Sequence, residues 1–160
     1  MKILYYATAY HATHGGSTHA KAFVEQCKAN EQVTEIAVYP PAPRGSAGQH
    51  QNVRRVLKSN RFLLPLFFWR RNQFHLPALK DFIISFRPDV IHIRLDSNFL
   101  QIKTLRKWFP RIIISTEVNA SPFDESFKQI IFRTFFRSLE RQALASSDLN
   151  FFVSNELRRR

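Results

Sequence analysis

Apolar residues along this chain fall into five short runs, and each run predicts a β-strand. Most of the runs are continuously apolar rather than alternating, which is typical of strands covered on both faces in a parallel sheet. The predicted strands span residues 3–7, 33–39, 90–95, 112–115 and 149–153.

The segments between these runs carry helical periodicity. Ser17 is the expected N-cap of a first helix, and Ala20, Phe23, Val24 and Cys27 then fall on one face of it. A thiol on that face is expected to serve packing.

A second amphipathic pattern precedes the last strand. Phe127, Ile131, Phe135 and Leu139 form an i+4 stripe. Residues 121–124 supply a capping serine, a proline in the first turn and an acid three residues after the cap, so we expect the helix to begin there.

Alternating strands and helices predict the α/β class, as a Rossmann-like three-layer domain with a mostly parallel sheet. With 160 residues, of which 44% are hydrophobic, the chain is expected to form one domain, 1–160. Its single cysteine excludes an intrachain disulfide, and no apolar run is long enough to span a bilayer.

Charge changes this picture, because 24 Lys and Arg against 12 Asp and Glu give a formal net charge of +12. Such an excess implies an anionic partner: nucleic acid, an anionic membrane surface or a phosphorylated small molecule. We find no recognisable nucleic-acid reader motif and expect no nucleic acid.

Many of the cations stand beside aromatic residues between positions 54 and 71. This insert is either an interfacial membrane anchor or a solvated basic face over a core-packing helix. The membrane-surface candidates are Arg54, Arg55, Lys58, Arg61, Trp69, Arg70 and Arg71.

The first strand is followed by a polar loop and then by Gly15, Gly16, Ser17 and Thr18 at a helix start. Glycines let the backbone approach a ligand closely, and the free N–H groups of a helix N-terminus attract phosphate or carboxylate. The segment is therefore either an anion site or a plain strand-turn-helix corner.

Three segments together resemble the N-terminal half of retaining glycosyltransferases of family 4, which have the two-Rossmann GT-B fold. The strand and glycine loop at 3–19 resemble the family's first glycine loop, and residues 86–92 (FRPDVIH) resemble its "PDVVH" strand entry. Residues 139–158 resemble the helix, strand and "VS…L" ending that closes this half.

This resemblance implies sugar transfer from a nucleotide-diphosphate sugar to a glycan or lipid-linked acceptor, with retention at the anomeric carbon and no required cofactor. It also implies that the donor binds mainly in a C-terminal domain that this chain lacks, so the chain alone is expected to be inactive. In the family the glycine loop, here Gly15 and Gly16, approaches the donor diphosphate across the interdomain cleft.

One departure concerns the histidine that many members carry after the fourth strand, where this chain has Glu117 and Asn119. A carboxylate and an amide can both hydrogen-bond sugar hydroxyls, so these two are the catalytic-site candidates, although a loop acid and a turn former are also typical here. The acceptor candidates are His14, His19 and Ser154.

The remaining histidines point to no metal site, because only His11 and His14 have useful spacing and no cysteine or glutamate joins them. His92 lies inside an apolar strand entry, where a structural role is expected.

Residues 154–160 resemble the start of a further helix, so we expect the protein to continue beyond them. The expected location is cytoplasmic, with peripheral contact at the inner face of the plasma membrane. The alternative is a stand-alone basic Rossmann-like module that binds a phosphorylated ligand or an anionic membrane without catalysis.

Overall fold

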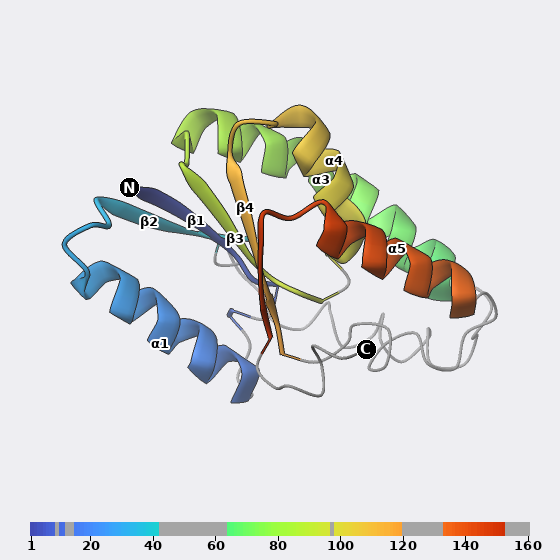
Figure 1. Cartoon of the computed structure of the whole chain (residues 1–160), viewed down its shortest axis with the longest axis horizontal. Helices are drawn as coiled ribbons and strands as arrows, with labels where there is room; N and C mark the ends of the chain where they lie inside the picture. The colour runs from blue at the N-terminus through green and yellow to red at the C-terminus, as the bar shows by residue number, and fades with distance from the viewer. Residues whose placement is uncertain (9, 12–14, 42–63, 97, 120–132, 153–160) are drawn as a thin grey trace.

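All five predicted strands are present. The computed structural model describes residues 1–8, 10–11, 15–41, 64–96, 98–119 and 133–152 (Figure 1). The strands are β1 (Lys2–Tyr6), β2 (Glu35–Tyr39), β3 (Val90–Arg94), β4 (Ile113–Val118) and β5 (Leu149–Phe152). The helices in the described residues are α1 (Gly15–Ala29), α3 (Leu64–Phe86), α4 (Phe99–Trp108) and α5 (Arg133–Ala145).

The strands form one sheet in the order β2-β1-β3-β4-β5, and all neighbours pair in parallel. From β1 the chain first steps to one side, to β2, and from β3 onward it builds the other side. Strand order therefore reverses between β1 and β3, and open α/β sheets bind ligands outside the carboxyl ends of their strands at such a point. The predicted Rossmann-like α/β domain is confirmed.

Helix α1 covers one face of the sheet. Tyr5 of β1 and the adjacent Ala7 pack against Ala20 and Val24 of this helix, and Phe23 joins them half-buried. The predicted apolar face of the first helix is thus confirmed.

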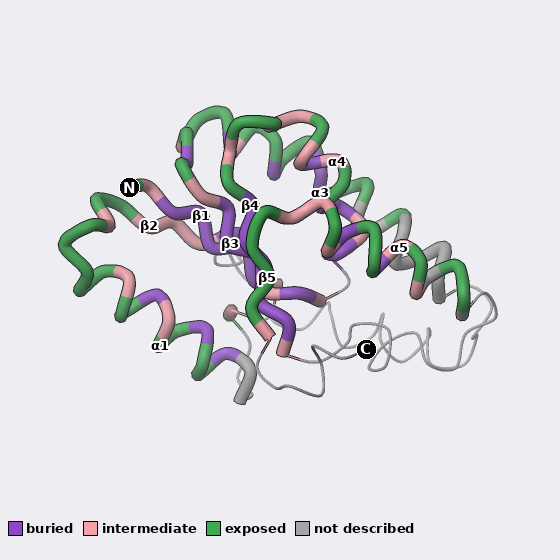
Figure 2. Tube along the Cα trace, viewed as in Figure 1, coloured by how far each residue is buried: buried purple, intermediate pink, exposed green. Residues whose placement is uncertain are grey.

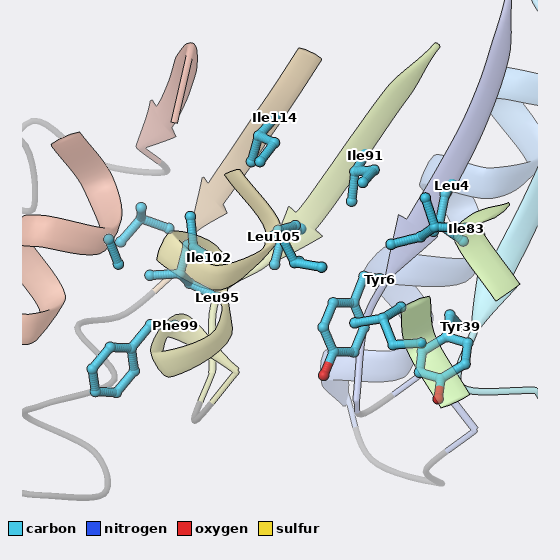
Figure 3. Packing of buried hydrophobic residues seen from close by; sticks show 14 residues of the cluster. Leu4, Tyr6, Tyr39, Ile83, Ile91, Leu95, Phe99, Ile102, Leu105 and Ile114 are labelled. Carbon is cyan, nitrogen blue, oxygen red and sulfur yellow. The ribbon is translucent and has the colours of Figure 1, made fainter. Parts of the chain in front are cut away.

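Helices α3, α4 and α5 cover the opposite face (Figure 1). Residues that alternate with Tyr5 along the strands point to this side, so Leu4 and Ile114 meet Ile83 of α3 and Ile102 of α4 in one core (Figure 3). Leu4, Ile102 and Ile114 have no exposed surface, and burial of such a side chain contributes about 1.5–3 kcal/mol.

Coverage of the sheet is uneven. The strand register puts Ile113, Leu149 and Phe151 on the face of the sheet that α1 covers. These three residues belong to β4 and β5, however, whereas α1 packs on the β1 and β2 part of that face. These side chains are 44%, 51% and 54% exposed, and β5 is mostly exposed along its length (Figure 2).

Two sequence predictions about helices are wrong in part. Ser17 is not an N-cap, because α1 begins at Gly15 and Ser17 lies buried in its first turn. Phe135 does not share the buried face of α5: it is 58% exposed, whereas Leu139 packs on the core. An i+4 stripe rotates by roughly 40° per step around the helix, so a long stripe leaves the core-facing side.

The predicted start of the last helix, at residues 121–124, lies outside the described residues. Within the described part of the chain, no helix combines the length and apolar character needed to cross a membrane.

Candidate functional site

A group of polar side chains gathers at the carboxyl ends of β3 and β4. Arg94 is the last residue of β3 and is aligned with Glu117, the penultimate residue of β4. Asn119 follows β4, and His19 reaches the same place from the first turns of α1. Together with His92 of β3 these residues form the Glu117 cluster, which stands where an open α/β sheet binds ligands.

Glu117 is the centre of the cluster. Its Oε1 atom lies 3.2 Å from His19 Nε2 and 3.3 Å from Arg94 Nη1, and it accepts a hydrogen bond from Asn119 Nδ2. Its Oε2 atom lies 3.6 Å from His92 Nε2. The residue is only 8% exposed, so a buried carboxylate is surrounded by donors from three segments of the chain.

These donors keep the carboxylate ionised. Burial alone would raise the pKa of Glu117, but hydrogen bonds from His92 and Asn119 and the charge of Arg94 outweigh it and lower the pKa to about 2. At neutral pH, Glu117 is therefore a fixed negative charge and a hydrogen-bond acceptor rather than a proton donor.

The His92 side chain is held in place by ring stacking and by a hydrogen bond. Its ring stacks on Tyr5 and on Phe23 with centroids 5.6 and 4.6 Å apart, and its Nδ1 atom lies 2.8 Å from Ser115 Oγ. With Nε2 directed at Glu117, the tautomer that fits has the proton on Nε2, and the Ser115 hydroxyl then donates to Nδ1. These contacts agree with the structural role expected for His92.

Ser115, His92 and Glu117 are the residue types of a nucleophilic triad, but they do not form one. Ser115 is buried in the middle of β4 at 4% exposure, so no substrate carbonyl reaches its hydroxyl. The Glu117 carboxylate is also shared among Arg94, His19 and Asn119 instead of being dedicated to the histidine.

Tyr5 lies next to this cluster with a fully buried ring. Among the described residues, no group lies within hydrogen-bond geometry of its hydroxyl. Burial, with the nearby Glu117 charge, raises the pKa of Tyr5 to about 12, against the opposite effect of Arg94, so the phenol stays protonated.

The glycine segment begins α1 beside the cluster. Gly15 and Gly16 are its first two residues, so the backbone of its first turn belongs to Gly15–Thr18. Thr18 is exposed, and the His19 side chain is 59% exposed while contacting Glu117. The predicted glycine segment and the predicted end of β4 thus lie at the same edge of the sheet.

A second polar contact joins neighbouring loops at this edge. Thr8, after β1, donates a 2.6 Å hydrogen bond to Asp96, after β3, and so ties the two loops on either side of the strand-order reversal. Asn98 closes the β3–α4 loop by accepting from the Asp96 backbone N–H and donating to the Arg94 carbonyl.

Sequence reasoning missed Arg94, Tyr5 and the contact between His92 and Glu117. Each depends on which strand residues are aligned across the sheet, and that register cannot be read along one chain. The available signal was an arginine at the end of a strand whose other residues are apolar apart from His92.

Several predicted site residues lie outside the described residues: His14, Arg54, Arg55, Lys58, Arg61 and Ser154. Trp69 and Arg71 fall within α3, but their side chains are not described, whereas Arg70 is exposed on that helix. Among the residues that are described, no three His, Cys, Asp or Glu side chains are grouped to hold a metal ion.

Comparison with protein-family models, curated proteins and solved structures found no match to this chain.

Proposed function

We propose that this chain is the acceptor-side half of a retaining glycosyltransferase that moves a sugar from a nucleotide-diphosphate donor to a glycan or lipid-linked acceptor. The observation that carries the proposal is the meeting of two features at one sheet edge: the glycine-led start of α1 and the ionised Glu117 with Asn119. The resemblance to family 4 implies a role in the site for both features. His19, on the same helix as the glycines, contacts Glu117 and so links the two.

The chemistry required of this half fits the cluster. Sugars are recognised by hydrogen bonds to hydroxyl groups, for which an ionised carboxylate and an amide are suited. Because Glu117 is held by Arg94 and His92, its orientation is set before a ligand arrives, which is how a site limits the entropy cost of binding.

The other parts of the proposal concern the complete protein. A C-terminal domain supplies most of the donor site, with the glycine loop approaching the donor diphosphate across the cleft. The enzyme acts in the cytoplasm and touches the inner face of the plasma membrane through the basic insert at residues 54–71.

The proposal is tested by sugar transfer in the complete gene product. Gly16→Val puts a branched side chain where the backbone is to approach the diphosphate, so turnover should fall by at least about a hundredfold, the usual effect of losing a main anion contact. Gly16→Ala is the matched control: it fits the helix and should keep more of the activity. Release of nucleotide diphosphate reports turnover, and thermal unfolding reports the fold of each variant.

Unchanged turnover in a folded Gly16→Val protein would contradict the role given to the loop. The alternative, a binding module without catalysis, is favoured by the net charge of +12 alone. It predicts that the protein transfers no sugar from any nucleotide sugar yet still binds phosphorylated ligands or anionic vesicles.

A further inference from the structure

The layer formed by α3, α4 and α5 carries a strong excess of positive charge. Among its described side chains, seven are lysine or arginine and two are acidic, and one of these acids, Glu140, is buried at 9% exposure. The basic residues are Arg70, Lys80, Lys103, Arg106, Lys107, Arg137 and Arg141.

The other side of the sheet lacks this bias. The described residues of α1 place Glu25 between Lys21 and Lys28, and Glu25 pairs with Lys28 at 2.8 Å. Of the helices on the two sides of the sheet, α3, α4 and α5 therefore carry the greater excess of described cations.

Not all of these cations are equally available. Arg106 is bound to Asp148 and to nearby backbone carbonyls, and Lys80 lies over the ring of Trp108. Lys103 and Lys107 of α4 are exposed, and Lys103 donates a 3.3 Å hydrogen bond to Gln142 on α5.

Apolar side chains stand exposed on the same helices. Phe74 and Ile84 of α3 are 81% and 53% exposed, and Phe135 of α5 is 58% exposed. Phe74 and Ile84 share the side of α3 that carries Arg70, opposite the buried Leu79 and Ile83, as the helical period requires. Cations interspersed with exposed aromatic and aliphatic groups are the composition of an interfacial membrane surface.

We propose that the outer surface of the α3–α4–α5 layer is a docking face for an anionic lipid bilayer. Charge complementarity selects an anionic partner, and the exposed phenylalanines favour a lipid surface over nucleic acid because they can enter the boundary between headgroups and acyl chains. The inference rests on the membrane part of the proposed function, which it extends from the insert to a folded surface, and it does not depend on sugar transfer.

The test is co-sedimentation of the full chain with vesicles of phosphatidylcholine mixed with phosphatidylglycerol, and with phosphatidylcholine alone. The wild type should bind the anionic vesicles and be released by salt. Replacing both Lys103 and Lys107 by Gln should weaken binding by roughly 10–30-fold, since each surface cation contributes several-fold to partitioning. Replacing Lys21 and Lys28 by Gln removes the same charge from α1 and should change binding by less than about threefold.

A second pair of variants tests the apolar part. Phe74→Ser should weaken binding and Phe74→Leu should largely keep it, and neither should unfold the protein because the side chain is exposed. Equal losses of vesicle binding in the Lys103/Lys107 and Lys21/Lys28 variants would overturn the inference. A wild-type protein that binds duplex DNA or RNA but not anionic vesicles would also overturn it.

The outcomes separate this inference from the proposed function. If the complete protein transfers sugar while the α4 variant sediments like the wild type, the docking face is wrong and the enzyme assignment stands. If the α4 variant loses binding but no nucleotide sugar is turned over, the docking face stands and the enzyme assignment fails.

Discussion

Glu117 combines a buried position with a negative charge, and this combination ties several elements of the fold together. It is buried and ionised, and its neighbours come from β3, α1 and the end of β4. A buried carboxylate is tolerated when its hydrogen bonds and opposite charges replace those it had in water. The side chains that pair with the Glu117 carboxylate are therefore held in place by the same contacts.

Stability should depend on pH through this carboxylate. The pKa of Glu117 falls from an ordinary 4.5 to about 2 in the folded protein, so its contribution is fully present above 4.5 and is lost as pH falls through about 2. Glu117→Gln should lower the free energy of unfolding by roughly 2–4 kcal/mol near neutral pH, and the difference from wild type should shrink in acid. Urea unfolding measured at several pH values checks this.

Glu25→Gln is the control for that experiment, because Glu25 is exposed and, within the described part of the chain, pairs with Lys28 on the protein surface. Its effect should stay below about 0.5 kcal/mol. A Glu117→Gln protein that is as stable as wild type near neutral pH would mean that the cluster does not hold the carboxylate as described.

At the scale of elements, sequence patterns predicted the strands well because each is an apolar run. The same patterns could not give the register that aligns Arg94 with Glu117, since alignment depends on how separate segments meet. The exposed Phe135 has a related cause: an i+4 stripe indicates a helix but does not fix how far around it the core extends. The candidate site was thus predictable as single residues and not as a cluster.

Helix α3 contains a proline in its interior, and its effect can be measured. Pro77 has no N–H to donate to the carbonyl of Gln73 and is itself exposed. Pro77→Ala should therefore raise the free energy of unfolding by roughly 1–3 kcal/mol. Ser85→Ala, at another exposed position of the same helix, should change it by less than about 0.5 kcal/mol. A Pro77→Ala protein less stable than wild type would show that α3 needs the proline.

At the scale of the whole molecule, the two sides of the sheet have different characters. One side carries α1 and leaves the apolar residues of β5 half exposed, and the other carries a continuous, strongly basic helical layer. The Glu117 cluster lies at the carboxyl ends of β3 and β4, on the face of the sheet that α1 covers.

If the Glu117 cluster binds a sugar substrate, its side chains should affect kcat/KM for transfer from a nucleotide sugar, measured with the complete gene product. We expect Asn119→Ala and Glu117→Gln to lower kcat/KM by about a hundredfold or more, and Glu25→Gln to leave it within about twofold. Circular dichroism at the assay temperature establishes that each protein is folded. Folded Asn119→Ala and Glu117→Gln proteins with wild-type kcat/KM would show that the Glu117 cluster takes no part in sugar transfer.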